Sequence, residues 1–147
     1  MNTCLKTNDG LDILRSVMTA FNNGSISEMI EPFDDQFTFI DQALGLEFTD
    51  KQRLKEFFEK SRELFPDTAI ELVSTYECGD NIIAEWRVTA TQVQKYVGLH
   101  QQLRISFAGV SVIHIEDERI THWSDYYDKS TSWRMNLAGF FTEWIEV

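Results

Sequence analysis

The stretch FAGVSVIHIEDERITHWSDYYD, residues 107–128, decides the fold that the sequence predicts. Its first half alternates with period two, which is typical of a strand with two different faces. One face carries Phe107, Gly109, Ser111, Ile113 and Ile115. The acidic residues 116–118 predict a solvated turn, after which a second strand begins near Ile120. One face of this second strand carries Thr121, Trp123, Asp125 and Tyr127, so Asp125 is expected between two aromatic side chains.

Length and composition limit what the chain can be. Its 147 residues, 43% hydrophobic and 25% charged, predict a single globular domain over residues 1–147 with a real core. The net charge of −11 argues against nucleic acid and anionic membrane as partners, because both attract positively charged proteins. There is no apolar run of membrane-spanning length and no signal-peptide core. We therefore expect a cytoplasmic protein in which Cys4 and Cys78 are free thiols.

Three helices are expected before the long strands. Apolar residues at helical spacing predict the first over about residues 10–22, ended by Gly24. Ser25 and Glu28 have the spacing of a capping box, and they predict a second, short helix that ends at Pro32. Thr49 and Gln52 have the same spacing and predict a third helix, closed by Pro66.

The remaining segments alternate as strands do. A short strand carries Phe37, Phe39 and Asp41 on one face, and residues from Thr68 onward keep a period of two. Helices segregated from an antiparallel sheet predict an α+β domain. The last segment, residues 129–147, is rich in large apolar side chains, so we expect it to dock on the domain or on a second subunit.

This order of elements, together with the motif ITHWSDYYD at residues 120–128, resembles the nuclear transport factor two-like superfamily. Within it the chain is most similar to SnoaL-like polyketide cyclases and limonene epoxide hydrolases, and more distantly to ketosteroid isomerase. The resemblance covers nearly the whole chain. It implies a cone-shaped, curved, mixed or antiparallel sheet wrapped around three N-terminal helices, with a deep apolar pocket inside.

The resemblance also assigns roles residue by residue. Asp125 falls where both the cyclases and the epoxide hydrolases place a catalytic aspartate, and Asp41 falls on the general base of ketosteroid isomerase. Arg87 matches the arginine of the hydrolases' Arg-x-Asp pair, but Thr89 stands where the pair has its aspartate. Phe39-x-Asp41 replaces their water-binding Tyr-x-Asn. The oxyanion-hole tyrosine and acid of the isomerase correspond to Val17 and Ser111, so both parent activities are disfavoured.

Asp125 is the predicted acid–base group, because burial of a carboxyl raises its pKa toward neutrality. Asp41 is a predicted helper, and Arg87 is predicted to set the charge of Asp125. Residues expected to bind substrate are Trp123, Phe39, Phe107, Ser111, Thr89, Glu85 and Tyr127. Two plainer readings stay open: Asp125 is a structural partner of Arg87, or Arg87 and Glu85 form a buried ion pair. No cofactor or metal is expected, since His100, His114 and His122 lack ligand spacing.

Two classes of function follow. The first is a cofactor-independent enzyme that cyclises or isomerises a small hydrophobic molecule, or less readily opens an epoxide. The second is a non-catalytic protein that binds such a molecule. A homodimer is expected in both cases, through an apolar stripe on the sheet face away from the pocket, made of Ile82, Trp86, Val88, Val110 and Val112.

Overall fold

The computed structural model describes residues 9–92, 103–128 and 130. Residues 93–102 and nearly all of the apolar segment at the C-terminus, for which docking was predicted, lie outside these residues. The described part has the order helix, helix, two strands, helix and four strands. None of its helices combines the length and the apolar character needed to cross a bilayer.

The three helices occupy the predicted places, but two caps differ from the prediction. They span Asp9–Asn22 (α1), Ile26–Ile30 (α2) and Lys51–Leu64 (α3), and Gly24 follows α1 with a φ of 74°. Ser25 makes no capping hydrogen bond with its side chain. The cap of α3 is Asp50, whose carboxylate accepts from the backbone N–H of Arg53 at 2.9 Å. A carboxylate one residue after Thr49 therefore takes the role predicted for the hydroxyl.

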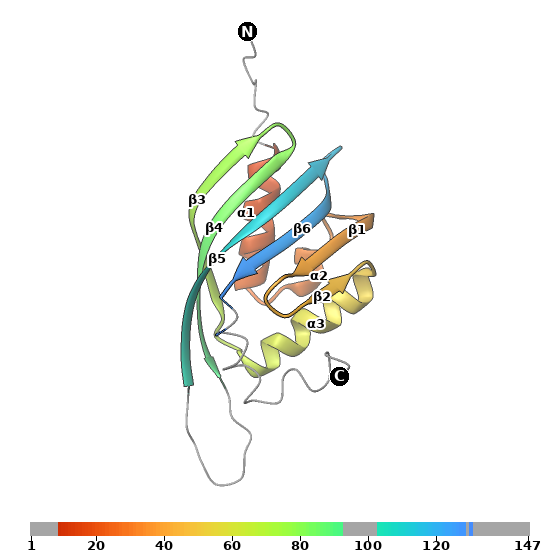
Figure 1. The fold of residues 1–147 in the computed structure, drawn as a ribbon. Coiled ribbons are helices and arrows are strands. Elements are labelled where there is room, and N and C mark those ends of the chain that lie inside the picture. Colours follow the sequence, from red (N-terminus) through yellow and green to blue (C-terminus); the bar gives the residue numbers. More distant parts are fainter. Residues whose placement is uncertain (1–8, 93–102, 129, 131–147) are drawn as a thin grey trace.

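The sheet has six strands and is mixed. Its strands are Phe33–Asp41 (β1), Leu46–Phe48 (β2), Ala69–Cys78 (β3), Asn81–Gln92 (β4), Leu103–Glu116 (β5) and Arg119–Tyr127 (β6). Their order is β2-β1-β6-β5-β4-β3; β1 runs parallel to β6, and all other neighbours are antiparallel. The sheet is curved and unclosed, and the helices cover one side of it (Figure 1). This confirms the predicted α+β architecture.

The predicted acidic turn joins β5 to β6. Asp117 and Glu118 have φ values of 49° and 63°, the left-handed pair that a tight hairpin with a type I′ turn requires. The hairpin pairs Ser111 with Asp125 and Ile113 with Trp123, so these side chains share one face of the sheet. The faces predicted for residues 107–115 and for Trp123, Asp125 and Tyr127 are confirmed. At the start of β6 the pairing is irregular, and Ile120, which pairs with Ile115 and is fully buried, takes the inner position that was predicted for Thr121.

On β4, however, the prediction of which face looks inward is wrong. The apolar residues of this strand are buried beneath the helices: Ile82, Ala84, Trp86, Val88 and Ala90. Glu85 and Arg87 are exposed on the other side, and Thr89 shares that side. Glu85 accepts a hydrogen bond from Ser74 at 2.8 Å there. The physical reason is the hydrophobic effect, because burial of these five apolar side chains stabilises the fold more than burial of the three polar ones would.

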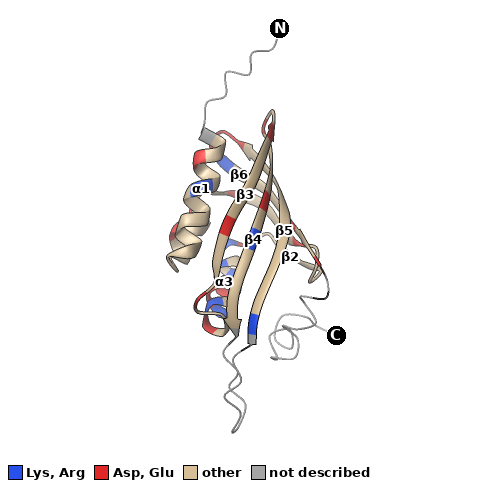
Figure 2. Ribbon diagram, turned by 90° about the vertical axis from the view of Figure 1, so that its left-hand side faces the viewer, with Lys and Arg blue, Asp and Glu red and all other residues tan. Residues whose placement is uncertain are grey.

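The predicted stripe for a dimer is wrong for the same reason. Ile82, Trp86 and Val88 belong to the core, and only Val110 and Val112 lie on the outer face. That outer face nevertheless exposes several large apolar side chains: Val73 (57%), Tyr76 (61%), Ile83 (43%) and Tyr126 (48%). In the view of Figure 2, the Lys and Arg positions along the ribbon lie among Asp and Glu positions.

Candidate functional site

A cavity of about 140 Å³ lies between the inner face of the sheet and the helices. Its walls come from α1, α2, α3 and five of the strands, and most of the lining side chains are apolar. An apolar cavity near 150 Å³ is large enough to hold benzene. The cavity therefore fits a molecule, or part of one, of about the size of a single ring.

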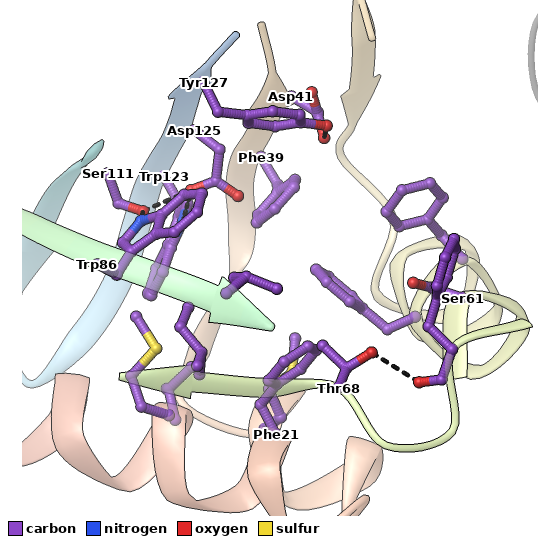
Figure 3. Close-up of a pocket in the computed structure, with 18 of the residues that line it drawn as sticks. Phe21, Phe39, Asp41, Ser61, Thr68, Trp86, Ser111, Trp123, Asp125 and Tyr127 are labelled. Carbon is purple, nitrogen blue, oxygen red and sulfur yellow. Dashed lines mark hydrogen bonds between the residues drawn. The ribbon is translucent and has the colours of Figure 1, made fainter. Parts of the chain in front are cut away.

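Two carboxyl groups face this cavity from neighbouring strands. Asp41 at the end of β1 and Asp125 on β6 are directly paired in the parallel register, so their side chains leave the sheet at the same level. The backbone N–H of Gln42 donates to the carbonyl of Asp125 at 2.9 Å and fixes the end of β1 against β6. Figure 3 shows both carboxyls at the same end of the cavity.

Asp125 is held by donors on one of its two oxygens. The Ser111 hydroxyl donates to Oδ1 at 2.5 Å, and the indole N–H of Trp123 donates to the same oxygen at 2.6 Å. The hydroxyl of Ser111 in turn accepts from the indole N–H of Trp86 at 2.8 Å. Within the described part of the chain, no hydrogen bond reaches Oδ2, which points toward the cavity (Figure 3).

The surroundings of Asp125 raise its pKa to about 7. Burial is the largest cause, because it penalises the charged carboxylate, and the nearby charge of Asp41 acts in the same direction. The hydrogen bonds from Ser111 and Trp123 favour the charged form and offset part of this rise. A carboxyl with this pKa can give or take a proton at neutral pH, as an acid–base group must.

Both carboxyl oxygens of Asp41 accept hydrogen bonds, in contrast to Asp125. The Tyr127 hydroxyl donates to its Oδ2 at 2.7 Å, and the backbone N–H of Leu44 donates to its Oδ1 at 2.9 Å. Burial raises the pKa of Asp41, while these donors partly counteract the rise. Desolvation and the neighbouring carboxyls raise the pKa of the Tyr127 phenol, so this hydroxyl stays a donor. The hydrogen bond from Tyr127 therefore holds the carboxyl of Asp41 in one orientation.

Aromatic rings form the walls around Asp125, as predicted. Phe39 stacks on Trp123 with ring centroids 6.3 Å apart and planes 22° apart. Phe107 contacts Tyr127, with centroids 5.3 Å apart. These four predicted residues and Ser111 line the cavity together with both carboxyls, whereas Arg87, Glu85 and Thr89 do not.

The indole of Trp86 reaches Ser111 because it lies over a glycine. Trp86 pairs with Gly109 across β4 and β5. A Cβ on Gly109 would lie 2.4 Å from Cη2 of Trp86 and 2.7 Å from the backbone carbonyl oxygen of Tyr126. Only a residue without a side chain leaves room for the ring, so Gly109 sets the position from which Trp86 donates.

We expect Gly109→Ala to lower the free energy of unfolding by about 3 kcal/mol, the upper part of the range for an overpacked core. The added methyl meets a buried ring and a backbone oxygen of the sheet, and neither can move without breaking packing or pairing. Urea denaturation measures the change. Gly10→Ala is the control, because its Cβ would meet only the ends of two flexible side chains, Ile82 at 3.2 Å and Ile115 at 3.8 Å. Equal stabilities of Gly109→Ala and wild type would contradict the close packing.

Metal ligation has no support in the described part of the chain, where no group of three or more His, Cys, Asp or Glu residues is arranged around a point. His114 and His122 lie on the outer face, as predicted, and bond to Asn81 and Ser124, respectively. Cys78 is a free, exposed thiol.

Sequence reasoning missed several residues of the site. Trp86 was placed on the outer face, although a tryptophan within an apolar row was a signal for the inner one. From the helical side, Phe21, Phe58 and Ser61 also line the cavity, with Thr68 from the segment before β3. Their helical spacing predicted burial but carried no signal for a cavity, because a core-facing and a cavity-facing residue have the same pattern.

Solved structures share this fold at low sequence identity. A proposed SnoaL-like polyketide cyclase from Shewanella putrefaciens is 12% identical, with a TM-score of 0.75 over 90% of this chain and 98% of that one. A proposed hydroxylase from Streptomyces galilaeus is 17% identical, with a TM-score of 0.73 over 88% and 85%. A ketosteroid isomerase-like protein from Catenulispora acidiphila, in complex with trimethylamine, is 16% identical, with a TM-score of 0.72 over 92% and 98%.

No functionally curated protein matches the chain significantly. A family model does match, and it covers residues 14–123, which include α2, α3 and most of the sheet. The match and the curved, unclosed sheet agree with each other. The chain belongs to the family of the SnoaL-like domain.

Proposed function

We propose that this chain is a cofactor-independent enzyme that cyclises or isomerises a small hydrophobic molecule, with Asp125 as its acid–base group. The observation that carries the proposal is a carboxyl with a pKa raised to about 7, aimed into an apolar cavity. Perturbed carboxyls in cavities mark functional sites. Membership in a family that includes cyclases and isomerases points the same way.

The chemistry would consist of proton transfer next to a carbonyl. The C–H bond beside the carbonyl breaks, its proton moves to Oδ2 of Asp125, and the electron pair shifts to the carbonyl oxygen. Return of the proton from Oδ2 to another atom of the molecule completes an isomerisation. In a cyclisation the enolate carbon attacks a second carbonyl of the same molecule, the π bond of that carbonyl breaks, and the resulting alkoxide takes the proton back from Oδ2. Phe39, Trp123 and Phe107 would supply the apolar walls.

A non-catalytic binding protein is the second candidate. It is favoured by the engagement of Asp41, whose two oxygens already accept from Tyr127 and Leu44. Acid–base catalysts often use two groups, and among the described residues of the cavity only Asp125 offers a carboxyl oxygen without a hydrogen bond. Such a protein would bind a small hydrophobic molecule in the cavity without converting it.

Hydrogen exchange at carbon separates the two candidates. Small cyclic ketones are incubated with the protein in D₂O, and deuterium uptake beside the carbonyl is followed by NMR. An enzyme of the proposed class binds a ketone and catalyses exchange, which Asp125→Asn removes. Binding that perturbs the protein spectrum, without catalysed exchange between pH 5 and 9, would identify a binding protein.

Epoxide opening is expected to be absent or very slow. It requires one group to activate water and another to protonate the leaving oxygen. Arg87 and Thr89, which stand at the positions of the hydrolases' Arg-x-Asp pair, lie on the outer side of β4, and Thr89 is not a carboxylate. Phe39 has no hydroxyl with which to hold water. Incubation with limonene oxide should yield no diol above the buffer background. Diol formed at an enzyme-like rate would contradict this prediction.

We also propose a homodimer, formed through the outer face of the sheet. Val73, Tyr76, Ile83 and Tyr126 expose large apolar surfaces there, and an open sheet face of this kind favours self-association. Size-exclusion chromatography with light scattering should give twice the 17.1 kDa of the chain. Tyr76→Lys, which places a charge on that face, should shift the protein toward the monomer. A wild-type monomer at micromolar concentration would refute the dimer.

A further inference from the structure

The hydrogen bonds around Asp125 form a directed chain. An indole N–H can only donate, so the hydroxyl oxygen of Ser111 must accept from Trp86 in their 2.8 Å contact. The hydroxyl proton of Ser111 then has Oδ1 of Asp125 as its acceptor, at 2.5 Å. Ser111 is fully buried, and Oδ1 of Asp125 is the acceptor that the described residues offer to its proton. Trp86 therefore fixes the direction in which Ser111 donates.

The same logic decides which oxygen of Asp125 can carry a proton. Oδ1 receives two donors, the hydroxyl of Ser111 and the indole N–H of Trp123. A proton on Oδ1 would face both donors and would leave the buried hydroxyl without an acceptor, at a cost of about 1–3 kcal/mol. Oδ2 has no such conflict, and it points toward the cavity (Figure 3).

We infer that Ser111 and Trp86 are positioning residues, which hold Oδ1 of Asp125 as a permanent acceptor and so make Oδ2 the atom that exchanges a proton with the ligand. The inference rests on the proposed function of Asp125. It also narrows the ligand, because a neutral Asp125 presents a hydrogen-bond donor on Oδ2. The cavity then suits a neutral molecule of about one ring with an acceptor oxygen, such as a ketone.

Few other groups near Asp125 can titrate. Asp41 on β1 and Tyr127 on β6 face it, and both line the cavity. On β4 and β5 the lining residues are not titratable, and the charged Glu85 and Arg87 are on the other side of the sheet. The helical residues of the cavity wall are apolar apart from Ser61. A measured change in the titration of Asp125 can therefore be assigned to the variant made.

The test is a ¹³C NMR titration of the ligand-free protein labelled at aspartate carboxyls, with the Asp125 signal assigned by its loss in Asp125→Asn. Ser111→Ala removes a donor that favours the charged carboxylate, so the pKa of Asp125 should rise by about 1–2. Trp123→Phe should also raise it, because it removes the second donor. Ser124→Ala is the matched control: it removes another buried serine hydroxyl, bonded to His122, and should leave the titration of Asp125 unchanged.

Trp86 is tested through Ser111. Trp86→Phe should change the pKa of Asp125 in the wild-type background and have no effect in the Ser111→Ala background, if it acts only by directing the serine. The double variant removes both partners of one bond, so it is also the form expected to fold if Ser111→Ala alone does not.

Two results would overturn the inference. The first is a pKa of Asp125 that is unchanged in Ser111→Ala or in the double variant, which would leave Ser111 with a purely structural role. The second is an equal effect of Trp86→Phe in both backgrounds, which would mean that the tryptophan acts through packing. These readouts need no substrate, so they are independent of the outcome of the deuterium exchange experiment.

Discussion

Asp125→Asn is expected to lower turnover by a factor on the order of 10²–10⁴, the usual loss when an acid–base group is removed. The amide has the shape of the carboxyl but neither releases nor takes a proton near pH 7. Turnover is measured as deuterium uptake by a cyclic ketone, or as product formation once a substrate is known. The binding constant of the ketone should change far less than the rate.

The fold should survive this substitution because of the way Asp125 is held. Both of its donors, Ser111 and Trp123, reach Oδ1, and the carbonyl oxygen of an asparagine can accept from both. The amide nitrogen then takes the place of Oδ2, toward the cavity (Figure 3). Near-ultraviolet circular dichroism, which reports on the packing of Trp86 and Trp123, should therefore match that of wild type.

Asp41→Asn is the control that separates the two carboxyls. Asp41 accepts from Tyr127 and Leu44, so its loss should disturb the end of β1 and the pKa of Asp125, with a smaller effect on the rate. Full activity of Asp125→Asn would make Asp125 structural and would refute its role as the acid–base group. If Asp41→Asn alone abolished turnover, the base would be Asp41, where ketosteroid isomerase places it.

The sequence predicted the elements well because local patterns determine them. The period of two in β5 and β6 reports alternation of side chains, and this alternation placed Trp123, Asp125 and Tyr127 on one face correctly. The turn at Asp117 and Glu118 was also predicted from neighbouring residues alone, because acidic residues in a row favour a solvated turn. Alternation also showed that β4 has two faces, but it does not say which one looks inward. There the matching of Arg87 to a family arginine gave the wrong face.

The contacts that make the site are long-range, which explains why the sequence did not predict them. Tyr127 and Asp41 are 86 residues apart, and Trp86 and Ser111 are 25 apart. Each pair depends on strand register, on Gly109 leaving room for an indole, and on the parallel pairing of β1 with β6. No pattern within a single strand carries this information.

A second large effect is expected in the pH dependence of stability. The pKa of Asp125 is about 7 in the folded protein, against 3.8 for an ordinary aspartate, so the folded state keeps its proton at pH values where the unfolded chain has lost it. Asp125 therefore contributes most to stability below about pH 4, and this contribution is lost as the pH rises through 7. The total change is on the order of 4 kcal/mol.

Asparagine does not titrate, so comparing Asp125→Asn with wild type isolates this contribution from those of the other acidic groups. The difference in unfolding free energy should shift in favour of the variant by about 4 kcal/mol between pH 4 and pH 8. Urea denaturation at several pH values, at one protein concentration, measures it. Asp67→Asn is the opposite control: hydrogen bonds from Thr91 hold the pKa of the Asp67 carboxyl below its usual value of 3.8. Wild type should therefore gain stability over that variant as the pH rises toward about 4, and their difference should stay nearly constant from about pH 5 to pH 8.

A constant difference between wild type and Asp125→Asn across this range would show that Asp125 has an ordinary pKa. The carboxyl would then be charged at neutral pH, so it could take a proton as a base but could not present the neutral donor on Oδ2 that we infer for ligand binding. The sign of the slope therefore bears on mechanism as well as on stability. A slope that levels off above pH 7 would place the proton on Asp125 in the range where an acid–base catalyst needs it.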